Sequence, residues 1–214
     1  NLGDTDPTLL SLSDLEEKGI VKKISEDKYK SLQRFDIEAN TQLVINQSQV
    51  LLLEHNIELY GILENYGKII HSNEMSIPIT DSDISSITMI ENSELDNDGT
   101  IIVDNFISSP GDKRSTINQS SVLIANNIAI ANNTTVENKG NILVYKIFNI
   151  GAHNVQSSTL TEKFTNTGNI STNTLQISDS EYLVNKGTIT PYNSANSGIV
   201  LMQLPPDGKS CATN

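Results

Sequence analysis

The side chains that most often do chemistry in proteins are few and scattered in this sequence. The three histidines, His55, His71 and His153, do not have the spacing of a metal site, and we expect each to lie in a solvated or turn region. The sequence has no glycine-rich phosphate loop and no serine in a nucleophile elbow. It therefore predicts neither a metal centre nor a cofactor site.

Two pairs of carboxylates are the best candidates for acid–base chemistry. Asp81 and Asp83, like Asp96 and Asp98, lie two residues apart, and residues two apart on a strand face the same side. Glycosidases use two carboxylates. Such pairs more often face solvent or bind Ca²⁺ weakly, and the aromatic residues expected in a saccharide cleft make up only 5% of the chain. We therefore predict that the chain is not an enzyme and has no catalytic residue.

Two features of interest for covalent modification have simple explanations. The single cysteine, Cys211, has no partner for an intrachain disulfide. Five Asn-x-Ser/Thr sequons begin at Asn46, Asn118, Asn132, Asn133 and Asn169. Because the chain contains 25 Asn residues, we interpret the sequons as compositional, and they matter only in a secreted chain.

The composition excludes some partners and favours one fold class. Acidic residues number 26 against 14 basic ones, so a chain of net charge −12 has no basic field for nucleic acid. No apolar run approaches the ~18 residues of a membrane span, and no signal peptide is recognisable. The 27 Ile residues suit strands and the 25 Asn residues suit turns. We therefore expect many short strands separated by tight turns.

The first 36 residues differ from the rest because they contain the only helical patterns. Ser13-Asp14-Leu15-Glu16 fits a capping box, and Gly19 predicts the end of that helix. Ser25-Glu26-Asp27 predicts a second short helix that continues through Leu32. Helices this short are unstable alone. Because the segment holds 6 of the 14 bases, we expect it to anchor the chain on an acidic neighbouring subunit; the alternative is that it caps the main domain.

From about residue 37 the chain carries an internal repeat, Asn-x-Gly-x-Ile. Its candidate structural residues are Asn65, Gly67, Asn97, Gly99, Asn138, Gly140, Asn166, Gly168, Asn185 and Gly187. The glycines are separated by 32, 41, 28 and 19 residues, in total 120, which fits six turns of about 20 if a degenerate copy such as Ala125–Ile130 lies in the gap of 41. A period of this size indicates a solenoid.

Each residue of the repeat has a role in such a solenoid. We expect the glycine to adopt positive φ at a bend, the isoleucine to begin an inward-facing strand, and the asparagines of successive turns to stack as an amide ladder. The alternative is a set of hairpin turns in an antiparallel protein. The longer gaps predict insertions near residues 71–86 and 108–121; the second contains the turn signal Ser109–Arg114.

The sequence therefore predicts an all-β chain with three parts. Residues 1–36 form a leader with short helices that anchors or caps the chain. Residues 37–192 form a right-handed parallel β-helix, that is, a β-solenoid, and residues 193–214 form a C-terminal cap or tail.

The repeat resembles that of β-helical structural and fibre proteins of large algal viruses and some marine phages. Leu95–Ile101 and Leu183–Ile189 are similar to the Leu-Thr-Asn-x-Gly-Thr-Ile repeat of those proteins, and Ile37–Ile45 is similar to their first coil. The resemblance covers about residues 10–190. It implies a virion structural protein, namely a capsid-associated, fibre or spike component. The implied partners are other virion proteins, further copies of the chain and a host surface glycan.

A second function class stays open at this point. Carbohydrate-binding or carbohydrate-cleaving β-helices, such as tailspike-type enzymes and bacterial adhesins, carry related repeats and would place the chain outside the cell or on its surface. A groove that gathers acidic and aromatic side chains together favours that class. Clustered acids without aromatics favour the structural role.

Overall fold

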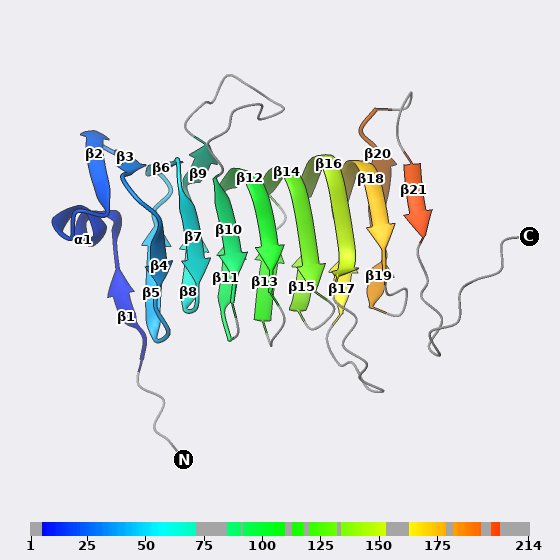
Figure 1. The fold of residues 1–214 in the computed structure, drawn as a ribbon, viewed down its shortest axis with the longest axis horizontal. Helices are drawn as coiled ribbons and strands as arrows, with labels where there is room; N and C mark the ends of the chain where they lie inside the picture. Colours follow the sequence, from blue (N-terminus) through cyan, green and yellow to red (C-terminus); the bar gives the residue numbers. More distant parts are fainter. Residues whose placement is uncertain are drawn as a thin grey trace, which may run out of the picture.

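A computed structural model describes residues 6–71, 85–90, 92–109, 113–117, 120–131, 134–152, 163–178, 182–193 and 198–201. In these residues the chain is built of strands, with one short helix, α1 (Leu12–Glu17). The all-β prediction is confirmed. The strands lie side by side along the long axis of the molecule, broadly in the order of the sequence (Figure 1). No helix in the described ranges is both long and apolar enough to cross a membrane.

The strands belong to two sheets, one of eight strands and one of thirteen. The smaller sheet contains, in spatial order, β1 (Thr8–Leu10), β5 (Thr41–Ile45), β8 (Ile62–Asn65), β11 (Glu94–Asn97), β13 (Lys113–Ile117), β15 (Thr134–Asn138), β17 (Phe164–Asn166) and β19 (Leu183–Asn185). The larger sheet contains β2 (Val21–Ser25), β3 (Lys28–Ser31), β4 (Phe35–Ile37), β6 (Val50–Leu53), β7 (Asn56–Leu59), β9 (Lys68–His71), β10 (Ser86–Met89), β12 (Thr100–Ser108), β14 (Val122–Ala131), β16 (Asn141–Ala152), β18 (Asn169–Ile177), β20 (Thr188–Pro191) and β21 (Gly198–Leu201).

Between β5 and β20 the chain alternates between the two sheets. We call one strand of the smaller sheet, together with the strand or strands of the larger sheet that follow it, a pass. Strands of successive passes pair in parallel, as β8 does with β11 and β14 with β16. Parallel neighbours need a long connection, and here the other sheet provides it. The prediction of parallel strands over residues 40–190 is confirmed in the described ranges, where only the β2–β3 pair is antiparallel.

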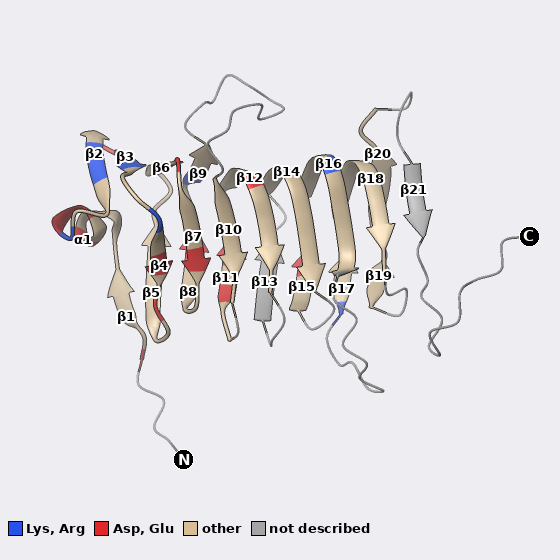
Figure 2. Ribbon diagram, viewed as in Figure 1, with Lys and Arg blue, Asp and Glu red and all other residues tan. Residues whose placement is uncertain are grey.

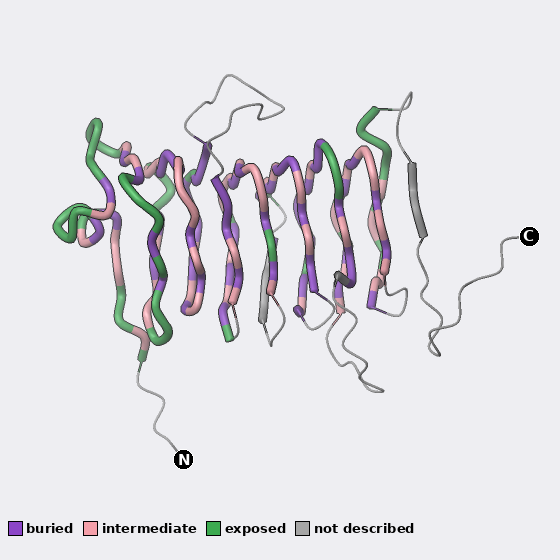
Figure 3. Tube along the Cα trace, viewed as in Figure 1, coloured by how far each residue is buried: buried purple, intermediate pink, exposed green. Residues whose placement is uncertain are grey.

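The core lies between the two sheets and runs along the whole stack. Alternate residues of most strands point inward, so Leu63 and Leu95 of the smaller sheet and Ile69 and Ile101 of the larger one are completely buried. Figure 3 shows this alternation of buried and half-buried positions in successive passes. Because each pass buries its inner face against its neighbours, the core depends on stacking.

The number of passes differs from the predicted six. The strands β8, β11, β13, β15, β17 and β19 are successive neighbours in the smaller sheet, so the chain makes five passes between Gly67 and Gly187. The extra length in the gaps of 32 and 28 residues includes 72–84 and 153–162, which lie outside the described residues.

The degenerate copy of the repeat is also placed differently. Ile117 pairs with Asn97 on one side and with Asn138 on the other, so the degenerate copy begins at Ile117. The predicted copy, Ala125–Ile130, lies inside β14. The insertion predicted over 108–121 is therefore wrong at β13, because backbone pairing with β11 and β15 makes a regular strand of a polar segment.

The helix of the leader starts earlier than predicted. Ser11, and not Ser13, is the N-cap: its Oγ accepts a hydrogen bond from the Asp14 amide (3.2 Å), and the Asp14 carboxylate accepts one from the Ser11 amide (2.6 Å). This register buries Leu12 and Leu15. The helix end at Gly19 is confirmed, and Gly19 has a φ of +69°.

The second predicted helix is wrong. Residues 21–31 form an antiparallel hairpin of β2 and β3, with Glu26 and Asp27 in the turn. Tyr29 and Ser31 are buried, two residues apart, because β3 pairs in parallel with β6 and follows the period of a strand. Pairing with the rest of the sheet overrides the weak helix signal.

The leader belongs to the common core. Leu12, Leu15, Val21 and Tyr29 pack in the same apolar cluster as the later strands, and β1 pairs with β5. Residues 1–36 contain eight acids against the six bases, so the charge argument for docking on an acidic subunit is wrong. Figure 2 shows acidic and basic residues interspersed along the ribbon at this end of the stack.

Candidate functional site

The Asn-x-Gly segments lie where the chain leaves the smaller sheet and enters the larger one. Asn65, Asn97, Asn138, Asn166 and Asn185 are the last residues of β8, β11, β15, β17 and β19. Each is followed by a two-residue connection that contains the glycine, and then by a strand of the larger sheet. We call these turns the Asn-x-Gly corners. The strand register places them in one line along the stack.

The asparagines of these corners form an amide ladder. The Nδ2 of Asn65 donates to Oδ1 of Asn97, that of Asn138 to Asn166, and that of Asn166 to Asn185, each at 2.7 Å. Asn65, Asn97, Asn138 and Asn166 are completely buried. A buried amide is costly unless its donors and acceptors are bonded, and here each asparagine supplies what its neighbour needs.

The ladder is interrupted where the repeat degenerates. Ile117 occupies its line between Asn97 and Asn138, so the Nδ2 of Asn97 has no ladder amide to bond. It donates to the Val122 carbonyl oxygen, as Asn65 does to that of Thr100, and also to the Gly99 carbonyl oxygen, both at 3.3 Å. At the other end Ile45 precedes Asn65 in the register. An isoleucine cannot donate, and the Oδ1 of Asn65 is buried without a hydrogen bond.

The glycines serve a different purpose from the one predicted. Gly67, Gly99, Gly168 and Gly187 do not adopt positive φ. A Cβ at Gly99 would lie 2.1 Å from the Gly67 carbonyl oxygen, and one at Gly168 would lie 2.2 Å from that of Gly140. The corners therefore stack backbone on backbone, and glycine is required because no side-chain atom fits between successive passes.

One further glycine that is required by a close backbone contact lies outside the Asn-x-Gly-x-Ile repeat. A Cβ at Gly61, at the turn from β7 into β8, would lie 2.3 Å from the carbonyl oxygens of Glu38 and Thr41. No asparagine precedes Gly61 by two residues, so the motif does not find it. The apolar runs on both sides of Tyr60-Gly61 are the only sequence signal.

A second polar line, also missed by the motif, follows the bend inside the long strands of the larger sheet. The Nδ2 of Asn127 donates to Oδ1 of Asn105 (3.0 Å), and that of Asn126 donates to Oδ1 of Asp104 (2.7 Å). Asn105 also donates to Asp104 (2.9 Å). We call this the Asp-Asn bend. It has no glycine, because the strand continues through it.

The histidines do not form a site in the described residues. His55 Nδ1 lies 3.3 Å from Ser31 Oγ. His71, at the end of β9, is 2% exposed, so the expectation of a solvated ring is wrong there. The described ranges contain no group of His, Cys, Asp and Glu side chains that could hold a metal ion.

The acid pair Asp96 and Asp98 lies beside an exposed tyrosine. Asp96 is in register with Glu64, and Tyr66 Oη donates to Glu64 Oε2 (3.2 Å). The Glu64 charge, desolvation and the charges of Asp96 and Asp98 all raise the pKa of Tyr66 above its usual value. Tyr66 is 42% exposed. Acidic and aromatic side chains thus do meet here, and Tyr60 Oη likewise donates to Glu58 Oε2 (3.1 Å).

Several predicted positions lie outside the described residues. They are His153, Asp81, Asp83, Asn118, Asn132, Asn133 and Cys211. Of the other sequons, Asn46 lies in an exposed turn and Asn169 is exposed at the start of β18.

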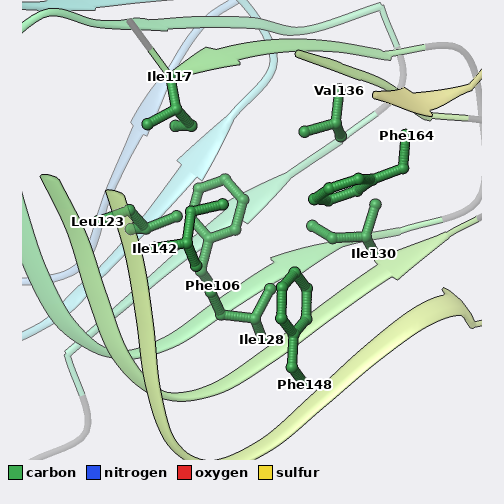
Figure 4. A pocket seen from close by; sticks show the side chains of 9 residues that line it. All are labelled: Phe106, Ile117, Leu123, Ile128, Ile130, Val136, Ile142, Phe148 and Phe164. Carbon is green, nitrogen blue, oxygen red and sulfur yellow. The ribbon is translucent and has the colours of Figure 1, made fainter. Parts of the chain in front are cut away.

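The interior contains a small apolar cavity between the sheets. Its volume is about 10 Å³, and Phe106, Phe148 and Phe164 are among the residues that line it (Figure 4). The void is too small for a ligand, and its apolar lining offers an ordered water no hydrogen-bond partner. Two of the rings that line it, Phe148 and Phe164, lie edge to face with centroids 5.7 Å apart, and the cavity is a packing defect of the core beside them.

Comparison with known proteins gives no relatives: no protein family, curated protein or solved structure matches this chain.

Proposed function

We propose that this chain is a structural protein whose passes form a right-handed parallel β-helix, and that it is a capsid-associated, fibre or spike component of a virion. The observation that carries the structural role is the use of the repeat residues. Four ladder asparagines are buried, and the ladder bonds join successive passes. Side chains that hold the stack together are not available to a ligand.

Support for the rod comes from the strand order. Parallel neighbours follow one another along the sequence in both sheets, as expected of a chain that winds in one direction. A crystal or cryo-electron microscopy structure tests the hand and closure of the winding. A left-handed winding, or two flat sheets that do not close, would contradict this part of the proposal.

The resemblance of the repeat is the only support for the virion location. It is also the only support for the proposed partners of this chain, which are other virion proteins and further copies of the chain. Immunogold labelling of purified particles from the source tests the location, with antibodies against the folded protein. We expect label on intact particles. Label confined to the soluble fraction would rule the location out.

A carbohydrate-binding role is the second candidate, and the surface around Tyr66 favours it. An exposed aromatic ring beside the carboxylates of Glu64, Asp96 and Asp98 offers both stacking and hydrogen-bond acceptors to a sugar. Glycan-array binding of the wild type and of Tyr66→Ala tests it, with Tyr192→Ala as the control because Tyr192 is 48% exposed elsewhere. Binding that Tyr66→Ala abolishes and Tyr192→Ala retains would favour this role.

A further inference from the structure

The two ends of the stack differ in how they close the core. At the N-terminal end, α1 and the β2–β3 hairpin bury Leu12, Leu15, Val21 and Tyr29 to 3% exposure or less. The antiparallel β2 interrupts the parallel pattern there. Natural proteins protect sheet edges from further pairing by covering them in this way.

At the C-terminal end the described strands stop at an Asn-x-Gly corner on which no further described strand stacks. In the described ranges β19 pairs only with β17, and β20 pairs only with β18. Leu183 and Ile189 continue the inward lines of Phe164 and Ile170, but they are only partly buried, whereas those two residues are at most 1% exposed. We call β19, β20 and the turn between them the terminal edge.

The ladder has a direction, and it points out of the terminal edge. At each bonded step the Nδ2 of one asparagine donates to Oδ1 of the asparagine in the following pass. Asn185 accepts from Asn166 in this way. Its own Nδ2 donates to no acceptor in the described residues, and its side chain is exposed.

The backbone of each corner has the same direction. The amide of the residue after the glycine donates to the glycine carbonyl of the preceding pass: Asn169 to Gly140, and Thr188 to Gly168, both at 2.9 Å. The amide of the residue before the glycine donates to the preceding asparagine carbonyl, as Lys186 does to Asn166 (2.7 Å). At the terminal edge, the equivalent acceptors are the carbonyl oxygens of Asn185 and Gly187.

The donor and acceptor groups of the terminal edge specify which polypeptide segment can bind there. The occupant needs an amide oxygen for Asn185 Nδ2, two backbone amides at fixed spacing, and an inward apolar residue over Ile189. It also needs a glycine, because at Gly99, Gly168 and Gly187 a Cβ would come within 2.2 Å of the carbonyl oxygen below. We propose that the terminal edge binds a segment of another polypeptide with the sequence Asn-x-Gly-x-Ile, which adds one parallel pass to the stack.

Residues 1–214 offer no unused copy of this segment. Residues 202–214 contain no Asn-x-Gly, and Pro205 and Pro206 have no amide hydrogen to donate. In a second copy of this chain the five motifs are used in its own stack. The inference rests on the stacking that underlies the proposed structural role, but not on the virion location.

A binding measurement with a peptide tests the inference on the full chain. The probe is a fluorescein-labelled peptide with the sequence of residues 163–178, which carries Asn166, Gly168 and Ile170; the control peptide carries Gly168→Val. We expect a saturable rise in fluorescence anisotropy with the first peptide, and at least about 10-fold weaker binding of the second, because a side chain cannot enter the corner contact.

A matched pair of protein variants locates the binding site. Asn185→Asp keeps an acceptor for Asn166 and removes the outward donor, whereas Asn46→Asp makes the same charge change in an exposed turn after β5. We expect Asn185→Asp to weaken binding about 10-fold and Asn46→Asp to leave it unchanged.

Sedimentation of the chain alone accompanies these titrations. Equal binding of both peptides, or equal effects of the two variants, would overturn the proposal. So would absence of binding up to millimolar peptide: a monomer would then have its edge covered by its own residues, and a dimer would have it covered by a second copy. Each of these failures leaves the structural role and the particle-labelling test untouched.

Discussion

The Asn-x-Gly corners and the Asp-Asn bend both turn the chain within each pass, but they do so by different physical means. At the corners the backbones of successive passes touch, so a glycine is required and the asparagine is buried. At the bend the strand continues, and Asp104, Asn105 and Asn127 are half-buried side chains that bond along the surface. Asn126 is the exception at the bend, since it is 1% exposed. Similar residue types therefore serve a buried frame at the corners and, Asn126 apart, a half-buried seam at the bend.

This difference shows that hydrogen-bond length alone does not decide which of the two regions contributes more to stability. The amide bonds are 2.7 Å at the corners and 2.7 to 3.0 Å at the bend. What differs is access to water, because a broken bond between the half-buried Asn105 and Asn127 can be replaced by water, whereas one at a corner leaves a buried group unbonded. The comparison yields three mutational predictions.

The largest expected effect is at the glycine of a corner. Gly168→Ala places a Cβ 2.2 Å from the Gly140 carbonyl oxygen, so two passes must move apart. We expect a loss of roughly 3 kcal/mol or more in the free energy of unfolding, at the upper end of what overpacking costs, because the obstructing atom belongs to the backbone. Urea denaturation followed by circular dichroism measures it.

Gly19→Ala is the matched control, because Gly19 is required for its dihedral angle and not for space. It has a φ of +69°, and a Cβ added there would have no atom within 4 Å. We expect a loss of about 1–2 kcal/mol from left-handed strain. If the two glycine variants lose the same stability, the close approach at the corners is not what selects glycine.

The second prediction compares the amides of the two regions. Asn166→Ala removes a ladder member that both accepts from Asn138 and donates to Asn185, and it should cost about 2–3 kcal/mol because buried polar groups lose their bonds. Asn105→Ala at the bend should cost less than about 1 kcal/mol, since water replaces its bonds to Asp104 and Asn127. Equal urea midpoints for the two variants would show that burial does not separate the regions.

The sequence predicted the corners because two independent constraints meet in one short motif. Stacking demands glycine and burial demands a self-complementary amide, so Asn-x-Gly recurs wherever both hold. It did not reveal why glycine is needed, because a positive φ and a contact with a residue 18 to 32 positions away select the same residue. Only the register of the strands distinguishes the two reasons.

The bend and the leader were beyond prediction for a related reason. The line that passes through Asn105 and Asn127 contains Asn56 and Ser86 on one side and Ile147 on the other, so asparagine recurs along it without an unbroken run and without a glycine at a fixed spacing. In the leader, the strand β3 follows from its pairing with β6, which lies about twenty residues later in the sequence. The local sequence pattern favoured a helix because it carries no information about the partner strand β6.

The smallest expected effect comes from placing an asparagine at the position where the ladder is interrupted. It tests whether the contribution of a buried amide to the free energy of unfolding depends on its position in the line. Ile117→Asn would place an amide between Asn97 and Asn138, where it can accept from one and donate to the other. The two bonds offset the lost burial of an isoleucine that is 1% exposed, so we expect stability within about 1 kcal/mol of the wild type.

Ile128→Asn is the control. Ile128 is 2% exposed and lines the same cavity, but it lies outside the ladder, and its replacement should cost roughly 3–4 kcal/mol. Urea denaturation of both variants gives the comparison directly. Equal losses would mean that the break at Ile117 is not a gap in an otherwise continuous ladder, and that the two runs of asparagines are independent of each other.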